Sequence, residues 1–269
     1  MDFALKVLAS FLVGGAYVAL ITYTAEHINP RLGGVLAGLP STALIGLIFI
    51  ALTQNDAVAV KADVAIPAGF GFTVLVVAAY VSLRKRCGIV QAVCAAVGLW
   101  LILASLVFGL LPKSLILATA IFLICFSISV WSLEKVEVKA SKRLTITSQE
   151  LIIRTVVAGT LIAIAVCLAK WLGAFIGGIV TAFPVIVVTS LTMLDYKRGQ
   201  NLMAATAKTM PFGSFGTVAF LLSFHFLVSH IGLAGGTLLS YVVSIIFALL
   251  ALQVRSRLNS RDSGPITPA

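Results

Sequence analysis

The sequence contains few charged residues: only 10% of its 269 residues are Asp, Glu, Lys or Arg, whereas 60% are hydrophobic. Together with a mean hydropathy of +1.12, this composition excludes a water-soluble globular domain. The charges are also biased in sign, with 19 Lys and Arg against 9 Asp and Glu. Because the basic residues lie in short loops that suit anionic lipid headgroups, we expect the lipid bilayer as partner and no nucleic acid.

The sequence also lacks the motifs of common enzyme classes. The nucleotide-phosphate loop G-x-x-x-x-G-K-[ST], the zinc motif H-E-x-x-H and the G-x-S-x-G nucleophile turn are all missing. The four cysteines show no paired spacing, so we interpret them as small packing residues without a disulfide or a metal ion. No acidic residue lies at the centre of a long apolar run. We therefore expect no enzymatic activity, no cofactor and no metal.

Long apolar runs are what the sequence has in abundance. A helix needs ~20 residues to cross the hydrocarbon core of a bilayer. Runs of that length predict an all-α integral membrane protein with nine transmembrane helices. The predicted spans are 3–25, 32–52, 64–83, 89–111, 114–132, 151–171, 175–195, 211–229 and 232–253.

One pattern occurs twice in the chain. The segment GGVLAGLP at Gly33–Pro40 returns as GGIVTAFP at Gly177–Pro184, an offset of 177 − 33 = 144 positions, and the same offset pairs Pro67 with Pro211. Repeats of this size in an apolar chain are typical of membrane transporters. The nine spans then divide as 4 + 1 + 4, and the single spacer helix delivers the second copy from the opposite side. The sequence therefore predicts inverted-topology repeats.

The predicted organisation has four parts. Residues 1–112 form repeat 1, residues 113–150 a spacer helix with a cytoplasmic linker, residues 151–254 the inverted repeat 2, and residues 255–269 a disordered cytoplasmic tail. The first apolar run corresponds to 151–171 in the second copy, so it is not interpreted as a cleaved signal peptide.

The basic residues divide unequally between the two sides of the predicted membrane. Only four of the 19 Lys and Arg residues fall on one side; they are Lys6, Lys61, Lys113 and Lys170. By the positive-inside rule, the N-terminus is expected outside and the C-terminus in the cytoplasm, in a multi-pass membrane protein. Whether the chain forms a homo-oligomer stays open.

The repeated motif is the candidate substrate site. A proline within a membrane helix removes a backbone hydrogen bond, and glycines before it lower the cost of unwinding. If the turns before Pro40 unwind, a new helix can begin at this proline within the membrane, where its free N–H groups attract an anion. The substrate-binding candidates are Gly33, Gly34, Pro40, Ser41 and Thr42 in the first copy, and Gly177, Gly178, Thr181 and Pro184 in the second.

An alternative interpretation of this motif needs no ligand. The glycines then serve close helix packing, and the prolines only kink their helices. His225, in LLSFHFLVSH, is likewise open to two interpretations, as a proton carrier or as a hydrogen-bond donor to a neighbouring helix. Its equivalent at 225 − 144 = 81 is Val81, so only one copy carries the histidine.

The motif region GGVLAGLPSTALIGLIFIAL, and more loosely GGIVTAFPVIVVTSLTML, resembles the glycine, proline and Thr/Ser-Ala-Leu pattern of the small GlpM-type bacterial inner-membrane proteins. Those proteins have about four helices and no firmly assigned substrate, so the resemblance implies a fusion of two such units in a bacterial membrane. The resemblance supplies no substrate. From the repeat and the helix starts at its prolines, we expect a secondary transporter of a small solute, an organic anion or a zwitterion, working by alternating access. The competing hypothesis is a non-transporting scaffold or accessory subunit.

Overall fold

The computed structural model describes residues 2–27, 40–110, 113–137, 147–185 and 187–262, and the regular structure in these ranges is entirely helical. In chain order the elements are α1 (Phe3–His27), α3 (Ser41–Thr53), α4 (Asp56–Asp63), α5 (Ile66–Leu83), α6 (Ile89–Leu110), α7 (Leu115–Glu134), α8 (Ser148–Trp171), α9 (Ala174–Thr181), the π-helix η1 (Val187–Leu191), α10 (Thr192–Arg198), α11 (Gln200–Ala207) and α12 (Met210–Asp262).

Six helical stretches are long and apolar enough to cross a membrane: 3–21, 56–83, 89–109, 115–134, 148–171 and 200–251. Large apolar side chains such as Leu101, Ile116 and Leu238 are exposed on several of them. These features indicate a multi-pass membrane protein, and the expectation of an all-helical chain is confirmed within the described residues. The count of nine helices and the 4 + 1 + 4 division stay predictions.

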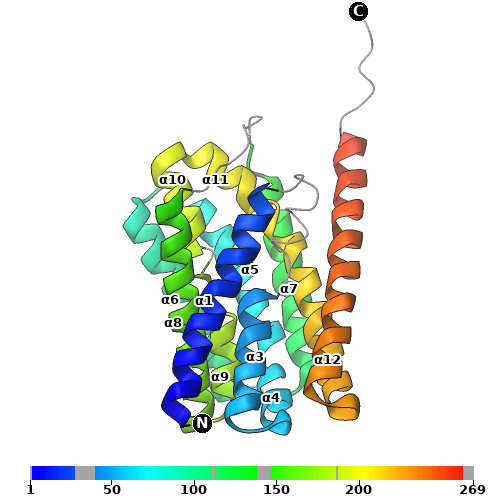
Figure 1. Ribbon diagram of the computed structural model, residues 1–269. Helices are drawn as coiled ribbons and strands as arrows, with labels where there is room; N and C mark the ends of the chain where they lie inside the picture. The colour runs from blue at the N-terminus through cyan, green and yellow to red at the C-terminus, as the bar shows by residue number, and fades with distance from the viewer. Residues whose placement is uncertain (1, 28–39, 111–112, 138–146, 186, 263–269) are drawn as a thin grey trace, which may run out of the picture.

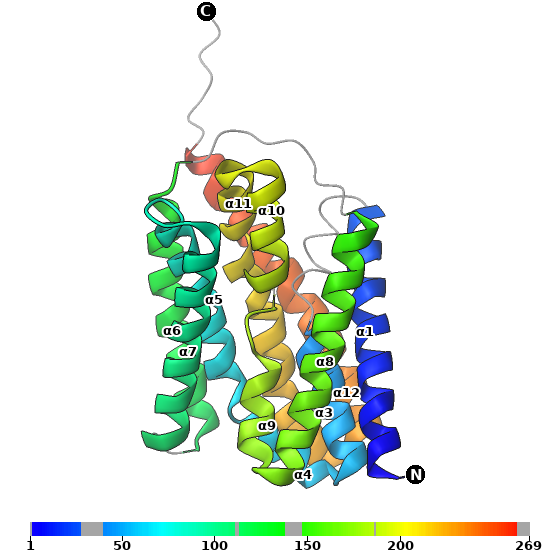
Figure 2. The same cartoon turned by 90° about the vertical axis from the view of Figure 1, so that its left-hand side faces the viewer.

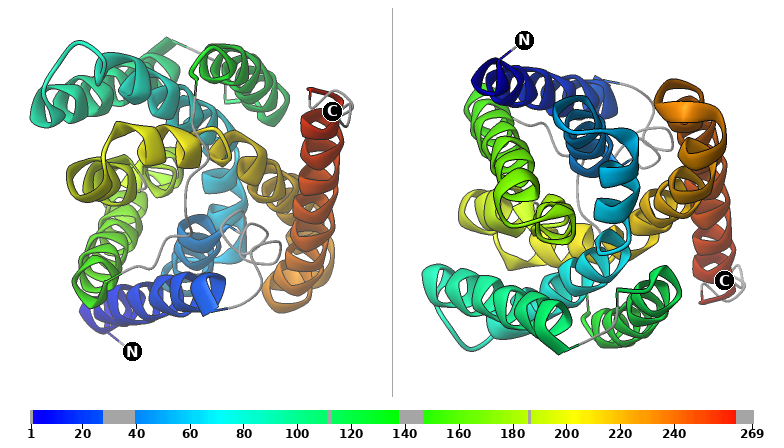
Figure 3. Two further views of the ribbon diagram at one scale, coloured as in Figure 1. Left: turned by 90° about the horizontal axis from the view of Figure 1, so that it is seen from above. Right: turned by 90° about the horizontal axis from the view of Figure 1, so that it is seen from below.

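The helices form a bundle with two distinct ends (Figure 1). One end, named the α4 end, holds the start of α1, the short helix α4 and the fold-back of α12. The opposite end, named the α11 end, holds α10 and α11. The helix α5 runs between these two ends near the middle of the bundle, as the views along the bundle show (Figure 3).

The central position of α5 agrees with its burial. In the stretch that contains α4 and α5, 72% of the most apolar window is buried, against 17–28% for the other five stretches. Glycine allows close contacts here: a Cβ on Gly71 of α5 would lie 2.8 Å from the Cα of Phe122 on α7. Likewise, a Cβ on Gly159 of α8 would lie 2.6 Å from the carbonyl oxygen of Phe11 on α1. Small residues thus let the backbones of neighbouring helices approach.

The helix α12 consists of two antiparallel parts that meet at Gly232. This glycine has φ 78° and ψ 173°, a backbone conformation that residues with a side chain rarely adopt. The two parts lie on either side of it, as the predicted spans 211–229 and 232–253 require. The second part continues to Asp262, so the predicted boundary of a disordered tail at 255 is too early. Residues 263–269 of that tail lie outside the described residues.

Two short helices occupy segments that the sequence predicts as loops. These helices are α4, which follows α3, and α11, which follows α10. The start of α4 is capped by Asn55, whose side chain accepts a hydrogen bond from the backbone N–H of Val58 at 3.0 Å. The bounds of α11 and α4 differ by 200 − 56 = 144 and 207 − 63 = 144 positions, and the next helices, α12 and α5, begin 210 − 66 = 144 positions apart. Figure 1 shows α4 and α11 at opposite ends of the bundle.

Two predicted spans differ from the structure. Of the span 32–52, residues 32–39 lie outside the described residues, and the remainder forms the 13-residue helix α3. The span 175–195 is not one helix: it is divided into α9, η1 and α10, with irregular backbone after Thr181. The physical reason is Pro184, which lacks the N–H that a continuous helix requires at that position.

Candidate functional site

The break between α9 and η1 is the central feature of the site. Figure 2 shows α9 toward the α4 end and α10 toward the α11 end, so the interruption lies between them, inside the bundle. The turn at Thr181 closes with short-range bonds, from the N–H of Ala182 to the carbonyl of Ile179 and from Phe183 to Val180, both at 3.1 Å. Residues Ala182–Pro184 then leave the helical path. A discontinuous helix of this kind is how many carriers expose backbone to a substrate.

Hydroxyl groups from other helices bond the carbonyls at the break. Thr42 of α3 donates from Oγ1 to the carbonyl of Thr181 at 3.0 Å, and Thr73 of α5 donates to the carbonyl of Ala182. In hydrocarbon an unsatisfied backbone group is costly, so these two donors replace the hydrogen bonds that the interrupted helix has lost. Both donors come from the first predicted repeat and both acceptors from the second.

An aromatic side chain completes this set of contacts. The indole Nε1–H of Trp100 on α6 lies 3.2 Å from Thr73 Oγ1 and 3.3 Å from the carbonyl of Gly69. The same indole meets the ring of Phe183 edge to face, with centroids 5.3 Å apart. Trp100 therefore positions both the donor hydroxyl and the first residues of the break.

The helix α3 begins beside the break. Its first residue is Ser41, directly after Pro40, which occupies the N-cap position with φ −76° and ψ 69°. A helix start at this proline agrees with the structural part of the sequence prediction. With 13 residues at ~1.5 Å each, α3 covers only part of a bilayer, so its positive end lies within the bundle (Figure 1).

The predicted site residues have different environments. Gly33 and Gly34 lie outside the described residues. Gly177 is packed against α8, where an added Cβ would come within 2.6 Å of the carbonyl oxygen of Ala165, and Gly178 is packed against the carbonyl of Ala62 on α4. Close packing therefore accounts for these two glycines, as the alternative interpretation expects.

The polar candidates lie nearer the break. Thr181 is buried and its hydroxyl donates to the carbonyl of Gly178 at 2.7 Å. Its methyl group faces Gly46 of α3, where an added Cβ would lie 2.7 Å away. Pro184 is buried within the break, while Ser41 is half-buried in the first turn of α3. Thr42, Thr181 and Pro184 thus come together; their role in binding stays a prediction.

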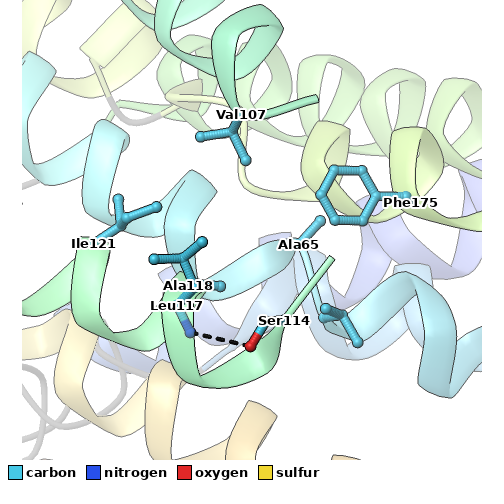
Figure 4. A pocket seen from close by; sticks show the side chains of 8 residues that line it. Ala65, Val107, Ser114, Leu117, Ala118, Ile121 and Phe175 are labelled. Carbon is cyan, nitrogen blue, oxygen red and sulfur yellow. Dashed lines mark hydrogen bonds between the residues drawn. The ribbon is translucent and has the colours of Figure 1, made fainter. Parts of the chain in front are cut away.

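A small cavity elsewhere in the bundle is not suited to a solute. It has a volume of about 10 Å³ and lies between α5, α6, α7 and α9, lined mainly by apolar side chains, among them Ala65, Val107 and Phe175 (Figure 4). Its one hydroxyl, Ser114, accepts a hydrogen bond from the backbone N–H of Leu117 at 3.4 Å. This volume is near the lower limit for a single water molecule.

His225 has an acidic partner that the sequence does not reveal. Its Nδ1 lies 3.3 Å from Oδ2 of Asp63, the last residue of α4, and the Asp63 side chain is 0% exposed. The distance is that of an ion pair, but the two groups lack hydrogen-bond geometry, and among the described residues neither carboxylate oxygen has a hydrogen-bond partner. Asp63 falls one residue before the predicted span 64–83, so it is easily mistaken for a loop residue.

A second acid–base cluster lies at the α11 end. Asp195 of α10 pairs with the guanidinium of Arg84, which follows α5, and accepts a hydrogen bond from the hydroxyl of Tyr80 at 3.1 Å. The Asp195 side chain is 1% exposed. Its hydrogen bond to Arg84 raises the pKa of that guanidinium, so Arg84 stays charged at all physiological pH values.

Comparison with known proteins adds one finding. Residues 7–112 match the family described as "Protein of unknown function (DUF3147)", which covers less than half of the chain. Searches of the curated proteins and of the solved structures each gave no match.

Proposed function

We propose that this chain is a secondary membrane transporter of a small solute, with its substrate site at the broken helix between α9 and η1. The observation that carries the proposal is the pair of hydrogen bonds from Thr42 and Thr73 to the carbonyls of Thr181 and Ala182. The two hydroxyls belong to α3 and α5, which are separate from the broken helix. A ligand with its own hydrogen-bond donors would bind the same two carbonyls in place of these hydroxyls. No ATP-binding motif supplies energy, so transport would be driven by a gradient.

Alternating access between inverted repeats is the proposed mechanism. It is supported by the offset of 144 positions that relates α4 to α11 and the start of α5 to that of α12, and by the location of α4 and α11 at opposite ends (Figure 1). The family match to residues 7–112 also falls within the predicted repeat 1. Rocking of one repeat against the other would then open the break first to one side and then to the other.

The proposed substrate is an organic anion or a zwitterion. The start of α3 at Ser41 presents the positive end of a helix dipole within the bundle. The carbonyls of Thr181 and Ala182 are acceptors for an ammonium group on the same molecule. The proposal includes two partners, a small solute and the bilayer. It also includes an inner-membrane location with a cytoplasmic C-terminus, and a relationship to the GlpM-type proteins.

A thermal-stability screen of the detergent-purified protein tests the proposal. Candidate ligands are carboxylates, organophosphates, amino acids and small organic cations at two pH values. A ligand at 100 times its Kd stabilises the folded state by ~2.7 kcal/mol. We expect stabilisation by a carboxylate or an amino acid, and then counterflow of that compound in proteoliposomes.

Three proline variants locate the site of any ligand found. Pro184→Ala restores an N–H that lets α9 continue through the break, and Pro40→Ala lets α3 extend backward; both are expected to abolish the ligand response. Pro67→Ala is the matched control, because Pro67 is a buried proline at the ordinary start of α5. If folded Pro40→Ala and Pro184→Ala variants keep the response and the counterflow, the site is elsewhere.

The second candidate is a non-transporting scaffold or accessory subunit. The contacts of Gly177 with α8 and of Gly178 with α4 favour it, because both glycines are explained by packing alone. A scaffold predicts no ligand response across the panel, together with normal stability of the Thr181→Val variant. A ligand-dependent shift that Thr181→Val weakens excludes it.

A further inference from the structure

Asp63 is a fully buried carboxylate in an apolar environment. It ends α4, a helix that packs against α3, α9 and α12, and α3 and α9 carry no ionisable side chain. Its nearest basic group is the imidazole of His225, 3.3 Å away, and among the described residues its oxygens accept no hydrogen bond. A buried ion that lacks hydrogen bonds is costly, so such a group within a membrane protein points to function.

The side chains of Asp63 and His225 differ in their exposed fraction. The Asp63 side chain is 0% exposed, whereas that of His225 is 26% exposed. Exchange of a proton would therefore take place at the imidazole, which is the more exposed of the two groups. The charges nearby lie at the edge of the cluster: on α4, Asp56 accepts a hydrogen bond from the N–H of Leu233, and Lys61 is exposed; on α12, His230 contacts the carbonyl of Phe226.

We propose that Asp63 and His225 together form a proton-binding site that couples the carrier to a proton gradient. This proposal rests on the proposed function and names its coupling ion. With one proton bound, a charged imidazole faces a charged carboxylate and the α4 end is closed. When the imidazole gives this proton to water, an unpaired carboxylate is left in an apolar environment. Separation of α4 from α12, which lets water reach Asp63, then relieves its desolvation.

The pair is in contact with the broken helix through one neighbouring residue. Ala62, next to Asp63, packs its carbonyl against Gly178 of α9, three residues before Thr181. Movement of the end of α4 therefore displaces the helix that leads to the break. This contact gives the proton site a direct physical connection with the proposed substrate site.

A second acid–base pair lies at the α11 end and offers a comparison. There an acid that follows a broken helix, Asp195, pairs with a base at the end of α5, Arg84. At the α4 end, the acid Asp63 pairs with His225 on the first part of α12, the helix that begins 144 positions after α5. Each pair joins the two predicted repeats, but only the one with histidine can lose its proton near neutral pH.

Two measurements on the purified full chain test the proton site without knowledge of the substrate. Infrared difference spectra between about pH 5.5 and about pH 9 report the carboxylate and imidazole bands of the pair. Spin labels at Ala57→Cys and Ser229→Cys, both exposed positions, report the separation of α4 and α12; Cys87, Cys94, Cys125 and Cys167 are replaced by alanine.

We expect the wild-type pair to titrate in this range and the label distance to acquire a longer component at high pH. Asp63→Asn removes the buried charge, so it should keep the short distance at both pH values. His225→Gln removes the cationic partner, so the buried carboxyl itself takes up the proton at low pH and the longer component should appear only at high pH. The control Arg84→Gln, which alters the pair at the α11 end, should keep the pH response. A label distance that ignores pH, or a pH response that survives Asp63→Asn, overturns the proposal.

Failure of the proton-site proposal can be distinguished from failure of the proposed function. A carrier confirmed by the ligand screen, with a pair that does not titrate, is driven by another ion or by the substrate gradient alone. A pair that responds to protons, with no ligand response at the break, indicates a proton-sensitive protein that is not this carrier.

Discussion

Thr42 and Thr73 show how single hydroxyl groups make a broken helix tolerable in a bilayer. Each donates to a carbonyl that a continuous helix would bond internally. A threonine hydroxyl normally bonds to the carbonyl four residues before it in its own helix, as Thr119 does to Leu115. The two threonines at the break instead donate to carbonyls of the broken helix, which is a different element from their own. These hydrogen bonds between elements distinguish the site.

The Thr42→Val variant is predicted to destabilise the fold. Removal of the hydroxyl leaves the buried carbonyl of Thr181 without its donor, which costs about 1–3 kcal/mol. Thr119→Val is the matched control, because the carbonyl of Leu115 retains its helical N–H donor, so its cost should be smaller. Free energies of unfolding in mixed detergent measure both. Equal effects of the two variants contradict the assigned role of Thr42.

Gly178 is predicted to tolerate no side chain. The Gly178→Ala methyl group would collide with the carbonyl of Ala62 on α4, and such overpacking costs about 1–3 kcal/mol. Gly98→Ala on α6 is the control, since no atom lies within 4 Å of the added Cβ there. It should leave stability unchanged or raise it by up to ~1 kcal/mol through helix propensity. A melting temperature of Gly178→Ala equal to that of the wild type would refute this contact.

At the scale of elements, α4 and α11 lie at opposite ends of the bundle, one within each predicted repeat (Figure 1). Each is a short helix that leads from a helix of at most 13 residues, α3 or α10, into a longer helix, α5 or α12. Near them lie the two acid–base pairs, Asp63–His225 and Arg84–Asp195. Each pair joins an element of the first predicted repeat to one of the second, so both report on the contact between the halves.

A double-mutant cycle on Arg84→Gln and Asp195→Asn is predicted to give a large coupling energy. Removal of one partner from a buried pair costs about 3–5 kcal/mol, because the other charge is left uncompensated. The comparison cycle uses Lys197→Gln and Glu150→Gln. That pair has a separation of 3.1 Å, and the Lys197 side chain is 34% exposed, so its coupling should be about 0–1 kcal/mol. Similar couplings from the two cycles contradict the buried character of Arg84–Asp195.

At the scale of the whole molecule, the start of α1 lies at the α4 end and α12 finishes beyond the α11 end (Figure 1). The ends of the described chain therefore lie on opposite sides of the bundle, as an odd number of crossings requires. The basic residues Arg84, Lys197 and Arg198 gather at the α11 end, next to α10 and α11. The positive-inside rule therefore predicts that this end faces the cytoplasm.

The predicted topology is testable with reporter fusions. A fluorescent protein after residue 262 should fold in the cytoplasm, whereas alkaline phosphatase fused at residue 2 should be active outside. A phosphatase fusion after residue 137, in the predicted linker, is the control and should be inactive. Reporters that place both ends of the chain on one side would exclude the odd number of crossings.

The sequence predicts much of the helical fold because the hydrophobic effect acts on each span separately. Long apolar runs identify most helices, and Pro40 indicates the start of α3 because proline has a fixed effect on its own backbone. The short helices α4 and α11 escape prediction, since they are neither long enough nor apolar enough to resemble a span. The break after Thr181 is only partly predicted, because proline can kink a helix as well as interrupt it.

By itself, therefore, the sequence determined that the chain is a helical membrane protein and that its glycine–proline motif occurs twice, since composition and local backbone chemistry need no neighbours. Only the tertiary structure decided which side chains meet. Thr73 lies 109 positions from Ala182, and Asp63 lies 225 − 63 = 162 positions from His225. Such contacts depend on how separate helices pack, and no local pattern around Asp63 distinguishes a buried ionic partner from a polar loop residue. The contacts that make up the site are therefore set by the packing of helices that lie far apart in the sequence.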